Sequence, residues 1–327
     1  MSKKLFTLRR KNLILKCAVC AALVAVAAAL VIRPERYLTA CFDGLCLWAE
    51  CVLPSLFPFM VICLLLIKAG APEVAAKPFK RLCGRLRLPE CAAPLALMSA
   101  VSGYPAGSRM VSEFYCLGKI DAAQAKRLAP LCSTCGPLFA LGTVGGKAFG
   151  GGGAGVKLLV SCLVSVIATS VVYCILSKSG EVRTVRTLSP KREENALYSA
   201  FYGAVNASLV AGGFICFFYT LSKIAADFNV LAPLHYALTP LFGDGLAEGA
   251  CLGLIEATGG CFALALAGGF FALPLAGFLI TFGGASILLQ QYCYLQACNV
   301  KAGFFIAFKL LQAVICFALL CLFGLFG

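Results

Sequence analysis

Four ionisable residues lie inside segments that are otherwise strongly apolar: Arg109, Glu113, Glu256 and Lys309. Charged side chains are costly in hydrocarbon, so those that occur there usually line a solute or ion pathway or pair with one another. Arg109 and Glu113 are four positions apart, so they share a helix face and can form an ion pair. That pair could belong to a binding site or could only hold its own segment together, and both interpretations stay open.

Glu256 and Lys309 differ in what surrounds them in the sequence. No basic residue lies near Glu256, so we favour a place in a polar cavity, where it could carry a coupling proton or cation. Lys309 lies in the last apolar segment. For Lys309 we expect a structural role, either snorkelling to the membrane surface or pairing within the protein.

The cysteines and the single histidine suggest little chemistry. Cys132 and Cys135 have the spacing of a redox or metal pair, but Cys17 and Cys20 share that spacing within a plain apolar segment. Most of the 20 cysteines lie in apolar segments, where a thiol acts as a small hydrophobe. We therefore expect reduced packing residues and no cofactor or metal. His235 is accompanied by no nucleophile, so we do not expect an enzyme.

Composition identifies the environment that these residues share. The 327 residues are 61% hydrophobic and 13% charged, against about 45–50% and about 25% in soluble domains. These values exclude an ordinary cytosolic enzyme, a disordered protein and a nucleic-acid-binding domain, and they predict an integral membrane protein. The net charge of +14 is then explained by Lys and Arg collected in cytoplasmic loops.

The apolar segments predict an all-α, polytopic membrane protein with about seven transmembrane helices and two re-entrant helical hairpins. The expected spans are 13–32, 48–67, 128–144, 156–176, 196–221, 270–295 and 303–325. Segments 92–117 and 245–269 are interrupted in their middle, and drawing them as hairpins keeps most Lys and Arg inside. The N-terminus is then cytoplasmic and the C-terminus is outside.

Four interruptions fall within apolar segments, two in each half of the chain. They lie at 102–108, 133–137, 256–260 and 281–286. Irregular backbone survives at membrane depth only within protein or beside a wet cavity, and paired breaks in inverted halves indicate a transporter-like site near the midplane. The predicted organisation is a basic N-terminus with the first helix (1–44), a first repeat (45–177), a cytoplasmic linker (178–195) and a second, inverted repeat (196–327).

Three motifs of the first half carry a resemblance to a known family. Residues 53–59 (LPSLFPF), 102–108 (SGYPAGS) and 136–139 (GPLF) resemble the sporulation integral membrane protein YlbJ family, which carries the nucleoside-recognition (Gate) domain. Residues 281–286 (TFGGAS) look like the matching element of the second half, and are similar to the broken helix of concentrative nucleoside transporters. The resemblance covers about residues 45–325 and implies a sporulation-associated protein of the bacterial inner membrane.

One departure from the family pattern affects the expected site. The family tends to have Asn and Ser before the proline break, whereas this chain has Cys-Ser-Thr-Cys at 132–135, which removes amide groups. The predicted substrate-binding residues are polar positions at or near the four breaks: Ser102, Gly103, Arg109, Glu113, Ser133, Thr134, Glu256, Thr258, Ser286 and Gln290.

The leading expectation is a secondary-transporter-like carrier for a small polar solute, nucleoside-like or anionic. Arg109 or a helix N-terminus would hold an anionic group of the solute. Expected partners are that solute, a coupling proton or cation and membrane lipid; an oligomer is compatible with the sequence, and nucleic acid is not expected. The alternative is a non-transporting scaffold for spore-envelope assembly, and a third class is a lipid or metal handler that uses its thiols.

Overall fold

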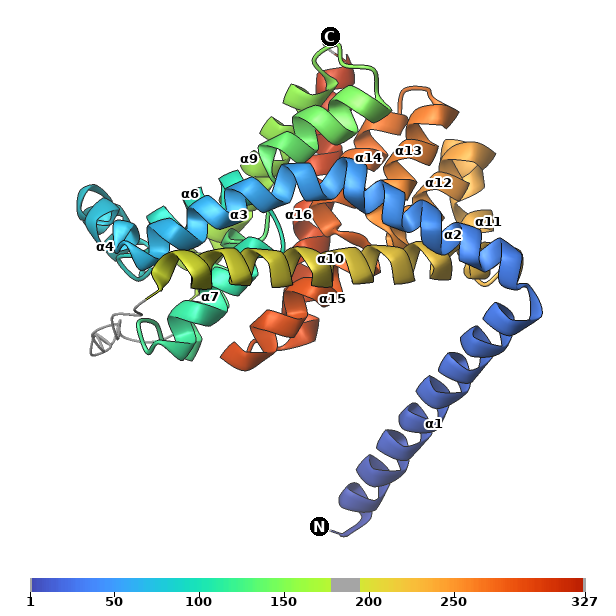
Figure 1. Cartoon of the computed structure of the whole chain (residues 1–327), viewed down its shortest axis with the longest axis horizontal. Coiled ribbons are helices and arrows are strands. Elements are labelled where there is room, and N and C mark those ends of the chain that lie inside the picture. Colours follow the sequence, from blue (N-terminus) through green and yellow to red (C-terminus); the bar gives the residue numbers. More distant parts are fainter. Residues whose placement is uncertain (1, 178–194, 326–327) are drawn as a thin grey trace.

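The computed structural model describes residues 2–177 and 195–325, and within them every regular element is a helix (Figure 1). The predicted all-α, polytopic class is confirmed. Most of the predicted linker, 178–194, lies outside the described residues. Five helices among the described residues are long and apolar enough to cross a membrane: Pro34–Lys68, Ala154–Leu176, Ala196–Asp227, Ala272–Cys298 and Ala302–Leu325.

The other two predicted spans, 13–32 and 128–144, are not among these five helices. Segment 13–32 lies wholly within the continuous helix α1 (Ser2–Ile32), which projects away from the other helices (Figure 1). Segment 128–144 is divided between α8 (Ala122–Leu131) and the π-helix η3 (Phe139–Ala148). The described residues thus contain five helices long and apolar enough to cross a membrane, and the predicted number of about seven spans stays a prediction.

The first half begins with one long helix that contains a π-helical turn. It is continuous across residues 44 and 45, where the sequence analysis set a domain boundary. The elements of this half are α2 (Pro34–Leu47), η1 (Trp48–Val52), α3 (Leu53–Lys68), α4 (Ala71–Ala75), η2 (Lys77–Phe79), α5 (Lys80–Arg85), α6 (Ala92–Ser102), α7 (Ala106–Cys116), α8, η3 and α9 (Ala154–Leu176).

The second half presents the same order: a long helix, short helical structure, a helical hairpin, a broken helix and another long helix. Its elements are α10 (Ala196–Asp227), α11 (Ala232–Phe242), α12 (Asp244–Ile255), α13 (Ala257–Ala267), α14 (Ala272–Phe282), α15 (Gly284–Leu295), η4 (Gln296–Cys298) and α16 (Ala302–Leu325). We call α6–α7 hairpin one, α12–α13 hairpin two, α8–η3 the first broken helix and α14–α15 the second broken helix.

The two long helices that open the halves lie side by side and run in opposite directions (Figure 1). Two glycines mark their close contact: Gly44 lies against Cys216, and Gly212 lies against the indole of Trp48. At the far end, Asp227 accepts a hydrogen bond from the Tyr37 hydroxyl at 3.0 Å. If the two halves are inverted repeats, their first helices must run in opposite directions, as these two do. The predicted domain limits stay a prediction.

The buried core is shared between the halves. One apolar cluster joins Leu95 of hairpin one and Leu128 of α8 with Phe305 of α16. A second cluster joins Leu158 of α9 with Leu264 of hairpin two. Because each cluster contains side chains of both halves, the two halves pack as one bundle around the breaks.

The first broken helix shows how the sequence sets its ends. Asp121 caps the start of α8: its carboxylate accepts from the Gln124 N–H at 2.8 Å, and the Gln124 amide oxygen accepts from the Asp121 N–H at 2.9 Å. The regular helix stops at Leu131 and resumes after Gly136. The residue where it resumes is Pro137, which has no N–H with which to continue the hydrogen-bond ladder backwards.

Candidate functional site

A small cavity of about 30 Å³ lies where the breaks meet. Hairpin one, the first broken helix, hairpin two and the second broken helix all contribute polar or glycine residues to its lining, among them Ser102, Gly103, Gly136, Glu256, Thr258 and Gln290, and Ser55 of α3 adds a hydroxyl. Residues from both halves of the chain therefore enclose one cavity, although they are separated by up to about half of the sequence.

Within each half, the hairpin tip contacts the broken helix, backbone against backbone. Gly103 has φ +74°, and a Cβ built on it would lie 2.5 Å from the nitrogen of Gly136. Gly284 has φ +56°, and its Cβ would lie 2.6 Å from the carbonyl oxygen of Gly253. Positive φ and such short distances both require glycine, so all four breaks belong to one contiguous region.

Glu256 is the acidic residue of this region and is almost fully buried, with 1% of its surface exposed. It separates α12 from α13, and its carboxylate accepts the backbone N–H groups of Thr258 at 3.1 Å and Gly259 at 2.6 Å. The carboxylate thus caps α13, whose N-terminal end carries a positive partial charge. A helix end therefore provides the stabilisation that a basic side chain would otherwise give.

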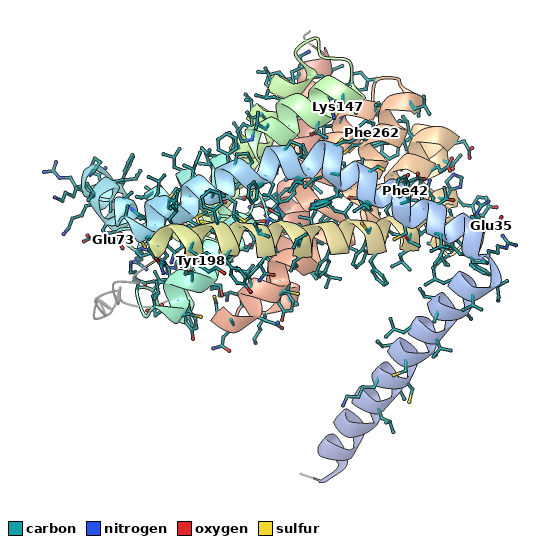
Figure 2. All side chains as sticks on the ribbon, viewed as in Figure 1. Glu35, Phe42, Glu73, Lys147, Tyr198 and Phe262 are labelled. Carbon is teal, nitrogen blue, oxygen red and sulfur yellow. The ribbon has the colours of Figure 1, made fainter. Side chains whose placement is uncertain are left out.

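A larger cavity, which we call the vestibule, adjoins the first one at Glu256. It has a volume of about 580 Å³ and is lined by Tyr219 and Lys223 of α10 and by Phe262 of hairpin two, among others. Figure 2 labels Phe262 close to Lys147, and Ala148, the next residue, lines the same vestibule. Glu256 lines both cavities, so it forms part of the wall between them.

Two π-helical segments flank the small cavity. The carbonyl oxygens of Glu50 and Cys51 in η1 accept from Lys147 at 2.9 Å and from Thr143 at 3.0 Å, both in η3. Such segments occur often at functional sites because they re-aim the chain within a helix. No local motif in the sequence predicts these two π-helical segments or their contact.

The unwound segment of the first broken helix is tied to the second half. The Oε1 atom of Gln291 accepts from the hydroxyls of Ser133 at 2.5 Å and Ser108 at 3.2 Å. The sequence analysis proposed the neighbouring Gln290, which lines the cavity and donates to Ser286 at 3.2 Å. Gln291 was missed because only the fold brings it to Ser133.

Lys309 is fully buried and does not snorkel, which corrects one of the two structural roles expected for it. Its Nζ atom donates to the carbonyl oxygen of Ser133 at 2.9 Å. One turn further along α16, the Nε2 atom of Gln312 donates to the carbonyl oxygen of Pro130 at 3.1 Å. Both carbonyls lie where α8 ends, so α16 provides donors that the broken helix lacks.

Arg109 does not reach the cavity. Its guanidinium donates to the carbonyl oxygen of Gly203 on α10 and fills the space above that glycine. Among the described residues no ion pair joins Arg109 to Glu113, although α7 places them one turn apart. The arginine therefore links hairpin one to α10, and nothing in its contacts supports the expected role in holding an anion.

Five of the ten predicted site residues line the small cavity: Ser102, Gly103, Glu256, Thr258 and Gln290. Ser133, Thr134 and Ser286 are buried but do not line it. Tyr104 also lines the cavity and was not predicted as a site residue, although it stands within the SGYPAGS motif.

The CxxC pair does not act as a unit. Cys135 lies 3.5 Å, sulfur to sulfur, from Cys162 of α9, whereas Cys132 packs in a different apolar cluster. All cysteines of the described residues are free thiols. In that part of the chain no group of three or more His, Cys, Asp or Glu side chains is arranged to hold a metal ion.

Over 220 residues the chain is 26% identical to the sporulation integral membrane protein YlbJ of Bacillus subtilis (strain 168). The match covers 60% of this chain and 53% of the relative, so it spans about half the relative's length. No family model and no solved structure matches the chain. The expected resemblance is confirmed: the chain is a membrane protein with several apolar helices, related to a sporulation integral membrane protein.

Proposed function

We propose that this relative of a sporulation membrane protein is a secondary-transporter-like carrier for a small polar solute, nucleoside-like or anionic. We place it in the bacterial cell membrane with a cytoplasmic N-terminus. The observation that carries the proposal is the buried Glu256, which lies where four helix breaks meet and lines two cavities. Carriers build their sites from discontinuous helices of two repeats in this way.

The cavity volumes are consistent with a closed state of the proposed carrier. A cavity of about 30 Å³ holds one or two water molecules, whereas sites for small ligands measure about 300–1,000 Å³. The vestibule, at about 580 Å³, falls within that range. We therefore interpret the structure as closed at its centre, with the solute first occupying the vestibule.

Hairpin two is the element best placed to open the wall between the cavities. Glycines with positive φ stand at both of its ends: Gly243 at +86°, Gly268 at +68° and Gly269 at +86°. A Cβ at any of these three positions would meet nothing within 4 Å, so the space beside each glycine is open. Hinges of moving elements have this character.

Glu256 is the proposed coupling residue. Proton binding would remove the charge that its carboxylate presents to the N–H groups of Thr258 and Gly259, and this would weaken the cap of α13. The tip of hairpin two would then be freer to move away from the cavity. Protonation of Glu256 would thus be coupled to the opening of hairpin two through the cap of α13.

Uptake into proteoliposomes tests the proposal, with a panel of radiolabelled nucleosides and small organic anions. We expect Glu256→Gln to abolish uptake while membrane insertion is preserved, because the amide cannot exchange a proton. Glu248→Gln is the matched control, since Glu248 is exposed on the same hairpin, and it should transport normally. Unchanged uptake by Glu256→Gln would reject the assignment.

The alternative function is a non-transporting scaffold in spore-envelope assembly. The relative's name, which records sporulation and an integral membrane location, supports it. Thermal unfolding with each solute of the panel separates the two functions, because a carrier is stabilised by a ligand that binds its folded state. A scaffold would unfold at the same temperature with every solute.

A further inference from the structure

The unwound segment between α8 and η3 contains carbonyl groups without helical donors. In an α-helix the carbonyl of one residue accepts from the N–H four residues later. For Ser133 that residue is Pro137, which has no N–H, and for Pro130 the helix has already ended at Leu131. In a membrane interior such carbonyls must find other donors.

Two side chains of α16 provide the donors, and they differ in charge. Gln312 satisfies the Pro130 carbonyl with a neutral amide, and Lys309 satisfies the Ser133 carbonyl with an ammonium. Both side chains have 0% exposure. None of the ion pairs within the described residues involves Lys309. Since an amide suffices one turn away, the hydrogen bond alone does not explain why a charged residue is buried here.

The surroundings of the ammonium explain the charge. The C-terminal end of α8 carries a negative partial charge, and carbonyls of an unwound segment beside such an end are the groups with which carriers coordinate Na⁺. An ammonium is a compact point charge with three donors, so it can replace a monovalent ion among carbonyl oxygens. The Ser133 carbonyl and the adjacent end of α8 thus favour a cation, and the Lys309 ammonium contacts that carbonyl.

We propose that the Lys309 ammonium occupies the cation position of the first broken helix as a tethered substitute for Na⁺. The protein then binds no metal cation at this break. The inference rests on the proposed carrier function, because it concerns which ion couples transport. It leaves Glu256, and hence a proton, as the coupling group.

At the second broken helix the donor to the carbonyl is neutral, in contrast to the charged donor at the first. The carbonyl oxygen of Ile280, close to the break at Gly283, accepts from the neutral hydroxyl of Tyr104 at 3.2 Å. Ile280 lies in the last turn of α14, as Pro130 lies in the last turn of α8, and both carbonyls receive a neutral donor. Only the first break receives a charged donor among the contacts of the described residues.

Cation titration of the purified protein in detergent tests the proposal without any solute. We would measure the unfolding temperature in NaCl, methylammonium chloride and choline chloride at equal ionic strength. The unfolding temperature of the wild type should be the same in the three salts. Lys309→Ala should be less stable in choline and should recover stability saturably with Na⁺ or methylammonium, as expected for a ligand that binds the folded state.

Gln312→Ala is the matched control, since it removes a buried donor from the same face of α16 without removing a charge. It should lose stability with no cation-specific recovery. A specific, saturable Na⁺ response of the wild type would overturn the proposal. A Lys309→Ala variant that responds to cations no more than Gln312→Ala would overturn it as well.

Lys309→Gln keeps the test decisive if the alanine variant does not fold, because it retains an amide donor. We expect this variant to be destabilised and to gain stability from methylammonium or Na⁺. If Lys309→Gln were as stable as the wild type and did not respond to cations, the charge of Lys309 would be dispensable. That result would reject the proposal. A failed uptake assay, in contrast, would reject the carrier function and leave the cation result unaffected.

Discussion

The hydroxyl of Tyr104 donates a hydrogen bond to the carbonyl oxygen of Ile280 and so connects the tip of hairpin one to the second broken helix. In the opposite direction, Lys309 of the second half donates to Ser133 in the first broken helix. Each half therefore satisfies a carbonyl that the break in the other half leaves without a helical donor. The two contacts make the breaks of both halves depend on one another.

Removing the Tyr104 hydroxyl should destabilise the protein. Tyr104→Phe leaves the Ile280 carbonyl without this donor, and an unsatisfied buried polar group costs about 1–3 kcal/mol. The free energy of unfolding in mixed micelles measures the effect. Tyr236→Phe is the control, since Tyr236 is 74% exposed and should tolerate the change. Equal stability of the two variants would show that the Tyr104 contact contributes nothing.

Substitution of Gly103 should disrupt the contact between hairpin one and the first broken helix. An alanine Cβ would lie 2.5 Å from the nitrogen and 3.0 Å from the Cα of Gly136, on backbone with positive φ. Overpacking of this kind costs about 1–3 kcal/mol or more. We expect Gly103→Ala to lower the unfolding temperature, whereas Gly142→Ala, with nothing within 4 Å, should not. A Gly103→Ala protein as stable as Gly142→Ala would contradict this close approach.

The breaks could be predicted from the sequence because they depend on local chemistry. Glycine and proline weaken a helix, and Gly103, Pro137 and Gly283 mark three of the four breaks directly. Pro58 and Pro130, in contrast, lie within continuous helices. Glu256 was identified for a related reason, since a lone carboxylate in an apolar segment requires compensation.

The partners of these residues could not be predicted, because they come from distant parts of the chain. From the sequence, Arg109 can pair with Glu113, its neighbour on the helix, but in the fold its guanidinium donates to the carbonyl of Gly203. Nothing in the sequence around Lys309 indicates that its partner is the carbonyl of Ser133, 176 residues away. One clue was available: Pro137 removes the donor of the Ser133 carbonyl, so a buried donor from another helix was needed.

Gln291 should act as a shared acceptor for two serines. Gln291→Leu would leave the hydroxyls of Ser108 and Ser133 without their common partner, at about 1–3 kcal/mol for each unsatisfied group. A double-mutant cycle with Ser133→Ala should show strong coupling: the serine change should cost less in the Gln291→Leu background than in the wild type. Unfolding free energies of the four proteins give the coupling. Additive effects would mean that the serine and the amide do not interact.

Alkylation should distinguish the cysteines by burial and should report whether the first break opens to water. Treatment of the folded protein with N-ethylmaleimide should modify Cys116, which is exposed at the end of α7. Cys135 and Cys162 should react only after unfolding, because both have 0% exposure. Mass spectrometry of peptides measures each rate. If Cys162 in the folded protein reacted as fast as Cys116, water would reach the unwound segment, and the closed state seen here could not be the dominant one.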